Sequence, residues 1–417
     1  MSIELYPEQQ LGYDAVQEWW RSLNWEENEL DNTKVLTNDS TQVFRLFGYA
    51  GTGKTTIIHV LIEDLKVKVC SAAFTGKAAL VMTRNGLEAT TVHSLIYKPV
   101  FPDKAEVKHL RGLIKEAVEG KQPQEKIKKL RQALKGANEI SFVANDESTL
   151  LDADLLVLDE CSMIDDEMAE DLLAFGKPVL VLGDPGQLPP ISGAGALTND
   201  KPDILLEKIH RQAEDNPIIK MSMQARAGVS IPHSNLGNTK HISKFDLKPE
   251  DVLAVDQILV GKNKTRFEWN MRIRSFLGFE GPYPVPGDKL ICLRNNMKKK
   301  LFNGLLCTVV KVGEDYPTYI NYEILTEDDQ TMHVDILRCH FDEYRAPGVV
   351  KTMQWWDKQE AEEFDYGYAI TVHKSQGSQW DDVLFYDDKF FVWDKANRKR
   401  WLYTGITRAA NTLLLVS

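Results

Sequence analysis

The segment Gly48-Tyr49-Ala50-Gly51-Thr52-Gly53-Lys54-Thr55 decides the fold of this chain. It follows a short apolar run, residues 43–47, and is followed by an amphipathic stretch, residues 57–65. A strand, a glycine-rich turn and a helix in this order form a phosphate-binding loop, in which backbone N–H groups and the helix N-terminus converge on phosphate oxygens. We therefore predict that nucleotide phosphates are bound here by Gly48, Gly51, Thr52, Gly53, Lys54, Thr55 and Thr56.

Carboxylates follow a second apolar run, Leu155 to Leu158, as the pair Asp159 and Glu160. A strand end beside a phosphate loop is where a Mg²⁺-binding aspartate belongs. We predict that Thr55 and Asp159 hold Mg²⁺, that Lys54 reaches the β- and γ-phosphates, and that Glu160 activates or orients the attacking water.

Three further side chains are candidates for contact with the γ-phosphate. Gln187 lies in the turn that follows the apolar run 178–182, where a glutamine can sense this phosphate. Arg211 and Arg408 are candidates for neutralising the charge that develops during hydrolysis. By spacing alone, either arginine is better explained as a surface ion-pair partner.

Apolar runs alternate with helical stretches through the chain, which predicts an α/β fold with parallel sheets covered on both faces. One of these runs, residues 253–260, is expected to form a single strand. Residues 104–118 and 124–136 have helical periodicity inside a long interruption, and its flanks, 95–101 and 139–143, are candidates for paired strands. From residue 289 to about 344, short strands separated by turns predict a small β insertion.

The composition is that of a globular chain of 417 residues with a net charge of −11 and five scattered cysteines. We expect free thiols, no membrane span, no secretory signal and a cytoplasmic location, in a host cell if the chain is phage-encoded. Residues 104–135 nevertheless contain ten Lys or Arg against four Glu. This track is either a nucleic-acid contact or a solvated helix face.

The motifs together resemble those of superfamily 1 helicases, most closely the 5′-to-3′ branch that includes RecD and the phage helicase Dda. The resemblance covers nearly the whole chain, and the motif at 368–378 is its most distinctive part. It rests on Gln9, Ala73 to Ala79, Thr91 to Leu95, Asp159 to Met163, Gly183 to Pro190, His210 to Gln212, Tyr368 to Ser378 and Leu402 to Arg408.

The resemblance implies two RecA-like domains, residues 1–96 with 144–197 and residues 198–287 with 351–417. It assigns a pin or wedge to 97–143 and a supporting SH3-like β-barrel to 288–350. Gln9 is expected to read adenine and Gly377 to contact the nucleotide, with ATP and Mg²⁺ as cofactors. The expected DNA contacts are Phe74, Thr75, Lys77, His93, Thr371, His373 and Lys374.

The interpretation that follows is an ATP-dependent 5′-to-3′ DNA helicase acting as a monomer. Its expected partners are single-stranded DNA, duplex junctions, and single-strand-binding or replication proteins. Phe74 occupies a position where the 5′-to-3′ branch usually has proline. The leucine and two prolines after Gln187 nevertheless favour that branch. The alternatives are a translocase that displaces proteins or acts on RNA, and a nucleotide-gated scaffold that barely hydrolyses ATP.

Overall fold

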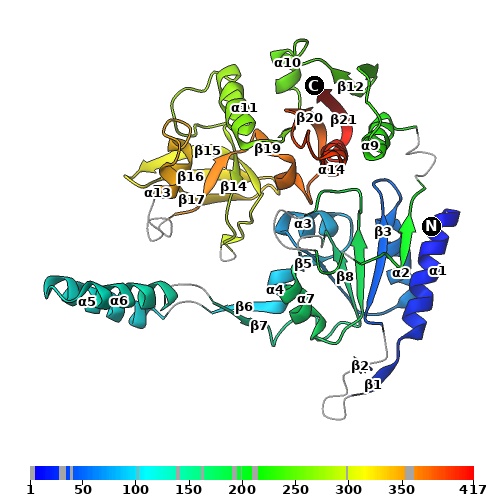
Figure 1. The fold of residues 1–417 in the computed structure, drawn as a ribbon, viewed down its shortest axis with the longest axis horizontal. Helices are drawn as coiled ribbons and strands as arrows, with labels where there is room; N and C mark the ends of the chain where they lie inside the picture. The colour runs from blue at the N-terminus through cyan, green and yellow to red at the C-terminus, as the bar shows by residue number, and fades with distance from the viewer. Residues whose placement is uncertain are drawn as a thin grey trace.

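Two α/β domains and a β insertion make up the chain, and a helical arm extends from the first domain (Figure 1). The computed structural model describes residues 5–27, 34–37, 41–100, 103–137, 141–160, 164–189, 195–198, 200–208, 215–296, 299–352 and 361–417.

The first domain contains a six-stranded, fully parallel sheet of order β10-β3-β9-β8-β4-β5. Alternate residues of each strand point to opposite faces, so Leu155 and Val157 of β8 pack under α1, α2 and α3, whereas Leu156 and Leu158 pack under α4 and α7. The strands are β10 (Ile204–Leu206), β3 (Val43–Gly48), β9 (Val179–Gly183), β8 (Leu155–Asp159), β4 (Val69–Ala73) and β5 (Ala89–Thr91). The helices are α1 (Pro7–Ser22), α2 (Lys54–Leu65), α3 (Gly76–Arg84), α4 (Val92–Ile96) and α7 (Asp166–Leu173).

The second domain contains a six-stranded sheet of order β11-β12-β21-β20-β13-β19, parallel except for its antiparallel edge strand β11. Helices α9 and α14 cover one face, and α10 and α11 cover the other. The strands are β11 (Ser234–Leu236), β12 (Thr239–Ile242), β21 (Ala409–Val416), β20 (Trp380–Tyr386), β13 (Gln257–Val260) and β19 (Ala369–Thr371). The helices are α9 (Pro217–Ala227), α10 (Pro249–Leu253), α11 (Asn263–Phe276), α14 (Lys395–Ile406) and the 3₁₀ helix η4 (Val372–Ser375).

The β insertion is a five-stranded antiparallel sheet of order β17-β16-β15-β14-β18. Its two ends approach each other, because Ile336 in β17 forms a bridge with Glu362, just before β18. That the insertion is SH3-like stays a prediction. Its elements are β14 (Lys289–Cys292), β15 (Leu306–Asp315), β16 (Tyr319–Thr326), β17 (Thr331–Leu337), α12 (Cys339–Asp342), α13 (Val349–Thr352) and β18 (Phe364–Tyr366).

The arm begins as an antiparallel ribbon of β6 (Tyr97–Val100) and β7 (Ser141–Ala144) and continues as α5 (Lys104–Glu119) and α6 (Gln124–Ala137). Both helices lie within about one residue of the predicted stretches, and the flanks of the interruption pair as strands. A two-stranded ribbon of β1 (Trp25–Glu27) and β2 (Lys34–Leu36) lies before the first sheet.

The α/β fold class is confirmed, but the structure differs from the sequence prediction in three places. Residues 253–260 were expected to form one strand, whereas α10 ends at Leu253 and β13 begins at Gln257. β10 completes the first sheet, beyond the expected domain end at 197. β18 pairs with β14 in the insertion, although its residues were expected in the second domain. Propensity alone could not place β10 or β18, because each is only three residues long.

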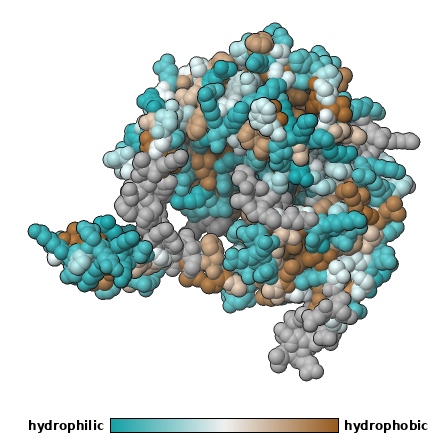
Figure 2. All heavy atoms as spheres, in the orientation of Figure 1, coloured by the Kyte–Doolittle hydropathy of each residue, from teal (hydrophilic) through white to brown (hydrophobic). Residues whose placement is uncertain are grey.

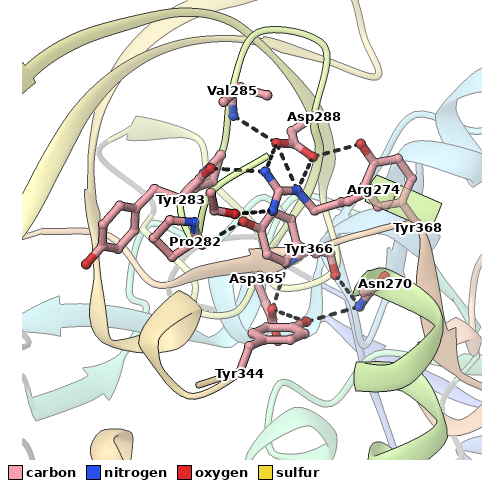
Figure 3. A network of polar contacts seen from close by, with 12 residues as sticks. Asn270, Arg274, Pro282, Tyr283, Val285, Asp288, Tyr344, Asp365, Tyr366 and Tyr368 are labelled. Carbon is pink, nitrogen blue, oxygen red and sulfur yellow. Dashed lines mark hydrogen bonds and ion pairs between the residues drawn. The ribbon is translucent and has the colours of Figure 1, made fainter. Parts of the chain in front are cut away.

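A buried ion pair joins the second domain to the insertion (Figure 3). Arg274 of α11 and Asp288 are 1% and 0% exposed, and Arg274 Nε donates to Asp288 Oδ1 at 2.9 Å. The guanidinium also donates to the carbonyls of Gly281 and Tyr283, and the hydroxyl of Tyr368 donates to Asp288. Both charges are therefore fully hydrogen-bonded, which a pair removed from water requires.

No helix among the described residues is long and apolar enough to cross a membrane.

Replacing Asp288 with Asn should strongly destabilise the protein, because the Arg274 charge would stay buried without its counter-ion. The expected cost is about 3–5 kcal/mol, seen as a large fall in the thermal midpoint. The control is Asp315→Asn, which breaks the Arg338–Asp315 pair in the same insertion; Asp315 is 60% exposed, so about 1 kcal/mol or less is expected. Equal shifts in the two variants would contradict this prediction.

Candidate functional site

Three predicted motifs meet at one edge of the first sheet. The phosphate loop follows β3, Asp159 ends β8, and Asp184 follows β9, and these three strands are neighbours in the order β3-β9-β8. The carboxyl ends of parallel strands open at the same edge of a sheet, where ligands bind in such folds. Residues more than a hundred positions apart in the chain therefore surround one space.

The phosphate loop has the backbone that an anion cradle requires. Gly51 and Gly53 adopt φ values of 81° and 77°, in the left-handed region, which only glycine enters without strain. Gly48 has no room for a side chain, because a Cβ there would lie 2.6 Å from Thr52 Oγ1. Lys54 Nζ donates to the carbonyl of Gly48 at 2.5 Å, so the ammonium lies at the mouth of the loop.

A cleft of about 460 Å³ lies between the two domains at this edge. Among the predicted residues, the first domain contributes Gly51, Lys54, Thr55, Asp159, Glu160 and Gln187, and the second contributes Gly377 and Arg408. Thus the two lobes enclose one site.

The carboxylates of Asp159 and Glu160 face this cleft. Glu160 has a φ of 51°, a conformation that costs a non-glycine residue energy and is concentrated at functional sites. Burial raises the pKa of Asp159, against the opposing charge of Lys54. Burial also raises the pKa of Glu160, against that of Arg408.

The residues present fit a nucleotide-bound Mg²⁺. The described residues contain no cluster of three or more His, Cys, Asp or Glu that could hold a metal alone. Mg²⁺ is usually held by one or two carboxylates together with substrate phosphates. Thr55 and Asp159 line the same cleft and supply oxygen ligands of this kind.

Gln187 and Arg408 face the site from opposite domains. Gln187 lines the cleft, and its Oε1 is a buried acceptor without a hydrogen-bond partner among the described residues. Arg408 is 6% exposed. It donates to the carbonyls of Thr404 and Ser378, both at 3.1 Å, which fixes the guanidinium at the cleft wall.

Not all of the predicted nucleotide residues line the cleft: Gln9 and the loop residues Gly48, Thr52, Gly53 and Thr56 are absent from its wall. Gln9 is buried, and its amide donates to the carbonyl of Thr52 at 3.3 Å while its oxygen accepts from the backbone N–H of Tyr6. Gln9 thus supports the phosphate loop, and its adenine contact stays a prediction. Arg211 lies outside the described residues.

Tyr403 of α14 is a residue whose role the sequence did not indicate. Its hydroxyl accepts the backbone N–H of Ala50 in the phosphate loop at 2.7 Å and donates to Asp184 Oδ2 at 2.7 Å. Next to it, Thr404 Oγ1 accepts the backbone N–H of Leu188 at 2.9 Å. The helix that leads to Arg408 is therefore hydrogen-bonded directly to the phosphate loop.

The predicted strand-contacting residues of the first domain lie together. Thr75 caps α3, and its hydroxyl accepts the N–H of Ala78. The ring of Phe74 lies 5.6 Å from that of His93. A Cβ on Gly377 would lie 3.2 Å from Thr75 Oγ1, so the second domain packs directly against this cap.

Lys77 is not free to contact a strand in this conformation. It is 9% exposed, forms a 3.2 Å ion pair with Glu327 of the insertion, and lies 4.6 Å from the centre of the Trp380 ring. Burial lowers its pKa, although Glu327 acts in the opposite direction. Its expected DNA contact stays a prediction that requires this pair to open.

The corresponding residues of the second domain lie on η4. Thr371 caps this helix by accepting the N–H of Lys374. Burial lowers the pKa of His373 and of Lys374. The His373 ring packs edge-on against Phe390, with 6.0 Å between centroids.

Family comparisons match both halves of the chain. A family model described as an AAA domain matches residues 30–245, about half of the chain. A second, described as a UvrD-like helicase C-terminal domain, matches residues 366–416.

Curated relatives include the ATP-dependent RecD2 DNA helicase of Deinococcus radiodurans, 27% identical over 87% of this chain. The chain spans 45% of the length of that relative. The RecBCD enzyme subunit RecD of Buchnera aphidicola is 28% identical over 94% of this chain and 73% of its own length.

Solved structures with this fold include the Pif1 helicase from Bacteroides in complex with ADP-AlF3 and single-stranded DNA. It is 18% identical, covers 99% of this chain and 92% of its own, and gives a TM-score of 0.52. The Pif1 helicase from Candida albicans is 17% identical, with coverage of 100% and 94% and a TM-score of 0.51.

Replacing Tyr403 with Phe should uncouple the two lobes without unfolding either, because the ring stays and only the shared hydroxyl is lost. Removing hydrogen bonds that include a charged acceptor costs about 1.5–3 kcal/mol. We expect kcat for ATP hydrolysis to fall about tenfold or more, with a thermal midpoint lowered by only a few degrees.

The control is Tyr13→Phe, which removes a hydroxyl that donates to Asp64 at 2.6 Å on the first domain's exposed surface. It should leave kcat unchanged. A Tyr403→Phe enzyme with unaltered kcat would show that the bridge has no part in turnover.

Proposed function

Because this chain belongs to the AAA-domain family and is a RecD-like member of helicase superfamily 1B, we propose that it is an ATP-driven DNA helicase moving 5′ to 3′ along single-stranded DNA. The observation that carries the proposal is the shared cleft. Lys54 and Asp159 come from one domain and Arg408 from the other, so a nucleotide bound there contacts both.

The chain's own residues suit hydrolysis in this cleft. ATP supplies the γ-phosphoryl group, and Mg²⁺ neutralises part of its charge when bound. Thr55 and Asp159 would hold the metal, and Lys54 and Arg408 would bring positive charge to the transferred group from the two domains. Gln187 Oε1 accepts a hydrogen bond from the attacking water, and Glu160 orients that water or removes its proton.

Closure of the cleft is the step that produces motion. Charge from both lobes converges on the γ-phosphate while it is present and is released after hydrolysis, so the lobes alternate between closed and open states. Tyr403 and Thr404 transmit this change, because they join α14 to the phosphate loop and to the turn after β9.

The strand runs across both domains in this proposal. Thr75 and His93 contact it from the first domain, and Thr371 and His373 from the second. These contacts are mainly to phosphates, so binding should be tolerant of sequence and sensitive to salt. That Pif1 from Bacteroides is solved with single-stranded DNA supports a strand as the partner of this fold.

Lys54→Ala should abolish strand-stimulated ATP hydrolysis, since no other lysine contributes to the described wall of the cleft, while binding of single-stranded DNA without nucleotide stays within about twofold. The control is Lys68→Ala, an exposed lysine of the same domain. A Lys54→Ala protein that still hydrolyses ATP would place the reaction elsewhere.

Polarity is tested with a pair of tailed duplexes. Strand release from a 5′-tailed but not a 3′-tailed duplex, requiring ATP and Mg²⁺, is the expected result. Release from the 3′-tailed duplex alone would reverse the polarity. Hydrolysis on either tail without release would favour a translocase, and the same pair with RNA tracking strands separates DNA from RNA.

A further inference from the structure

The helical arm stands clear of both domains at the end of the β6–β7 ribbon (Figure 1). Its helices pack against each other, burying Val107 and Ala117 of α5 and Ile127 of α6. A 16-residue helix is about 24 Å long. The arm is thus a slender rod, and Figure 2 shows its surface to be largely hydrophilic.

Its basic residues are concentrated on one side. In α5, Lys108, Arg111 and Lys115 follow one another at intervals of three and four residues, and in α6 Lys128 and Arg131 are three apart. Residues at these intervals share a helix face. All five are exposed, and they form what we call the basic stripe.

The two halves of the stripe combine because of the hairpin geometry. At 100° per residue around each helix axis, the basic residues lie about a quarter to a third of a turn from the buried apolar residues. The direction of this rotation, viewed along the chain, is the same in both helices. Because the helices run antiparallel, the same sense brings both sets to one side of the hairpin. Within the stripe, Lys115 pairs with Glu119 at 3.9 Å, and off this side Lys129 pairs with Glu125 at 3.6 Å.

The chemistry of the arm suits a double helix. Residues 104–137 contain no Phe, Tyr or Trp, whereas proteins that hold single strands stack bases on aromatic rings. Phosphate contacts alone suffice for a duplex, which carries a charge every 1.7 Å or so. A bilayer is not favoured, because the apolar faces are used in packing the helices together.

Aromatic rings are found instead where the arm joins the first domain. They form a continuous row, with centroid distances of 5.6 Å from Phe74 to His93, 6.1 Å from His93 to Tyr97 and 6.2 Å from Tyr97 to Phe142. Phe142 is 58% exposed. Stacking groups thus lie at the root of the arm, and cationic groups beyond it.

We propose that the basic stripe of the α5–α6 arm binds the phosphate backbone of duplex DNA ahead of the strand junction. The placement of the junction rests on the proposed helicase function, but the affinity for duplex does not. The arm holds the unopened duplex while the aromatic row at its root receives the separated bases. The contact is independent of sequence, since it involves no base edges.

The test compares two full-length triple variants that remove equal charge. Arg111, Lys128 and Arg131 of the stripe are changed to Gln in one, and Lys121, Lys126 and Lys129, off the stripe, in the other. Gln preserves helix propensity, and circular dichroism checks that the helices persist. Binding to a blunt duplex and to a single strand of equal length is measured by fluorescence anisotropy from 50 to 200 mM salt.

The stripe variant should bind duplex about tenfold or more weakly, and its salt-dependence slope should fall by roughly 2.7, at about 0.9 per lost phosphate contact. Its single-strand binding and strand-stimulated ATP hydrolysis should stay within about twofold, and its unwinding of a 5′-tailed duplex should slow. The off-stripe variant should behave like the unmodified protein in every assay.

Equal losses in the two variants, or equal losses for duplex and single strand, would overturn the proposal. Unchanged duplex binding by the stripe variant would also overturn it. This includes the case in which a parallel measurement shows that the variant has lost only its binding to phosphatidylserine vesicles. The proposed function is judged separately: Lys54→Ala should keep its duplex affinity. If the chain binds duplex through the stripe but never unwinds it, the proposed helicase function is wrong and the duplex-binding role of the stripe is retained.

Discussion

The contact between the two lobes depends on one hydroxyl group, that of Tyr403 in the second domain, which is hydrogen-bonded to the first. Tyr403 accepts an N–H of the phosphate loop and donates to Asp184, so two motifs of the first domain are held by one helix of the second. Its burial beside Asp184 raises the pKa of the phenol, which keeps it protonated and able to donate. Arg408, which lines the cleft between the lobes, follows Tyr403 by five residues in the same segment.

The insertion extends this mechanical connection to residues that are predicted to contact a strand. The Arg274–Asp288 pair fixes it to the second domain, while Glu327 holds Lys77 of the first domain. Phe302 of the insertion also packs against Gly76, where a Cβ would lie 2.6 Å away. The insertion is therefore fixed to one lobe and paired with a lysine of the other. In the proposed function, separation of the lobes would free this lysine for the strand as well as open the nucleotide cleft.

What the sequence predicted well is what is encoded locally. The phosphate loop depends on closely spaced glycines between a strand and a helix, and the two arm helices depend on a sustained apolar period. What it missed depends on contacts between distant residues. Tyr403 meets Ala50 across 353 positions and Lys77 meets Glu327 across 250, so neither residue carries a local signal of its partner. Lys77, an expected DNA contact, is paired in this structure because the fold places the carboxylate of Glu327 beside it.

The charged residues of the chain are distributed unevenly, which the net charge does not show. A net charge of −11 repels nucleic acid in general, so binding requires places where basic residues outnumber acidic ones. The arm is such a place, with ten Lys or Arg against four Glu in residues 104–135. Because screening limits these interactions to about 10 Å in 0.1 M salt, an arm standing clear of the acidic body keeps its attraction for phosphate. Distance from the rest of the protein is therefore part of how the arm would select its ligand.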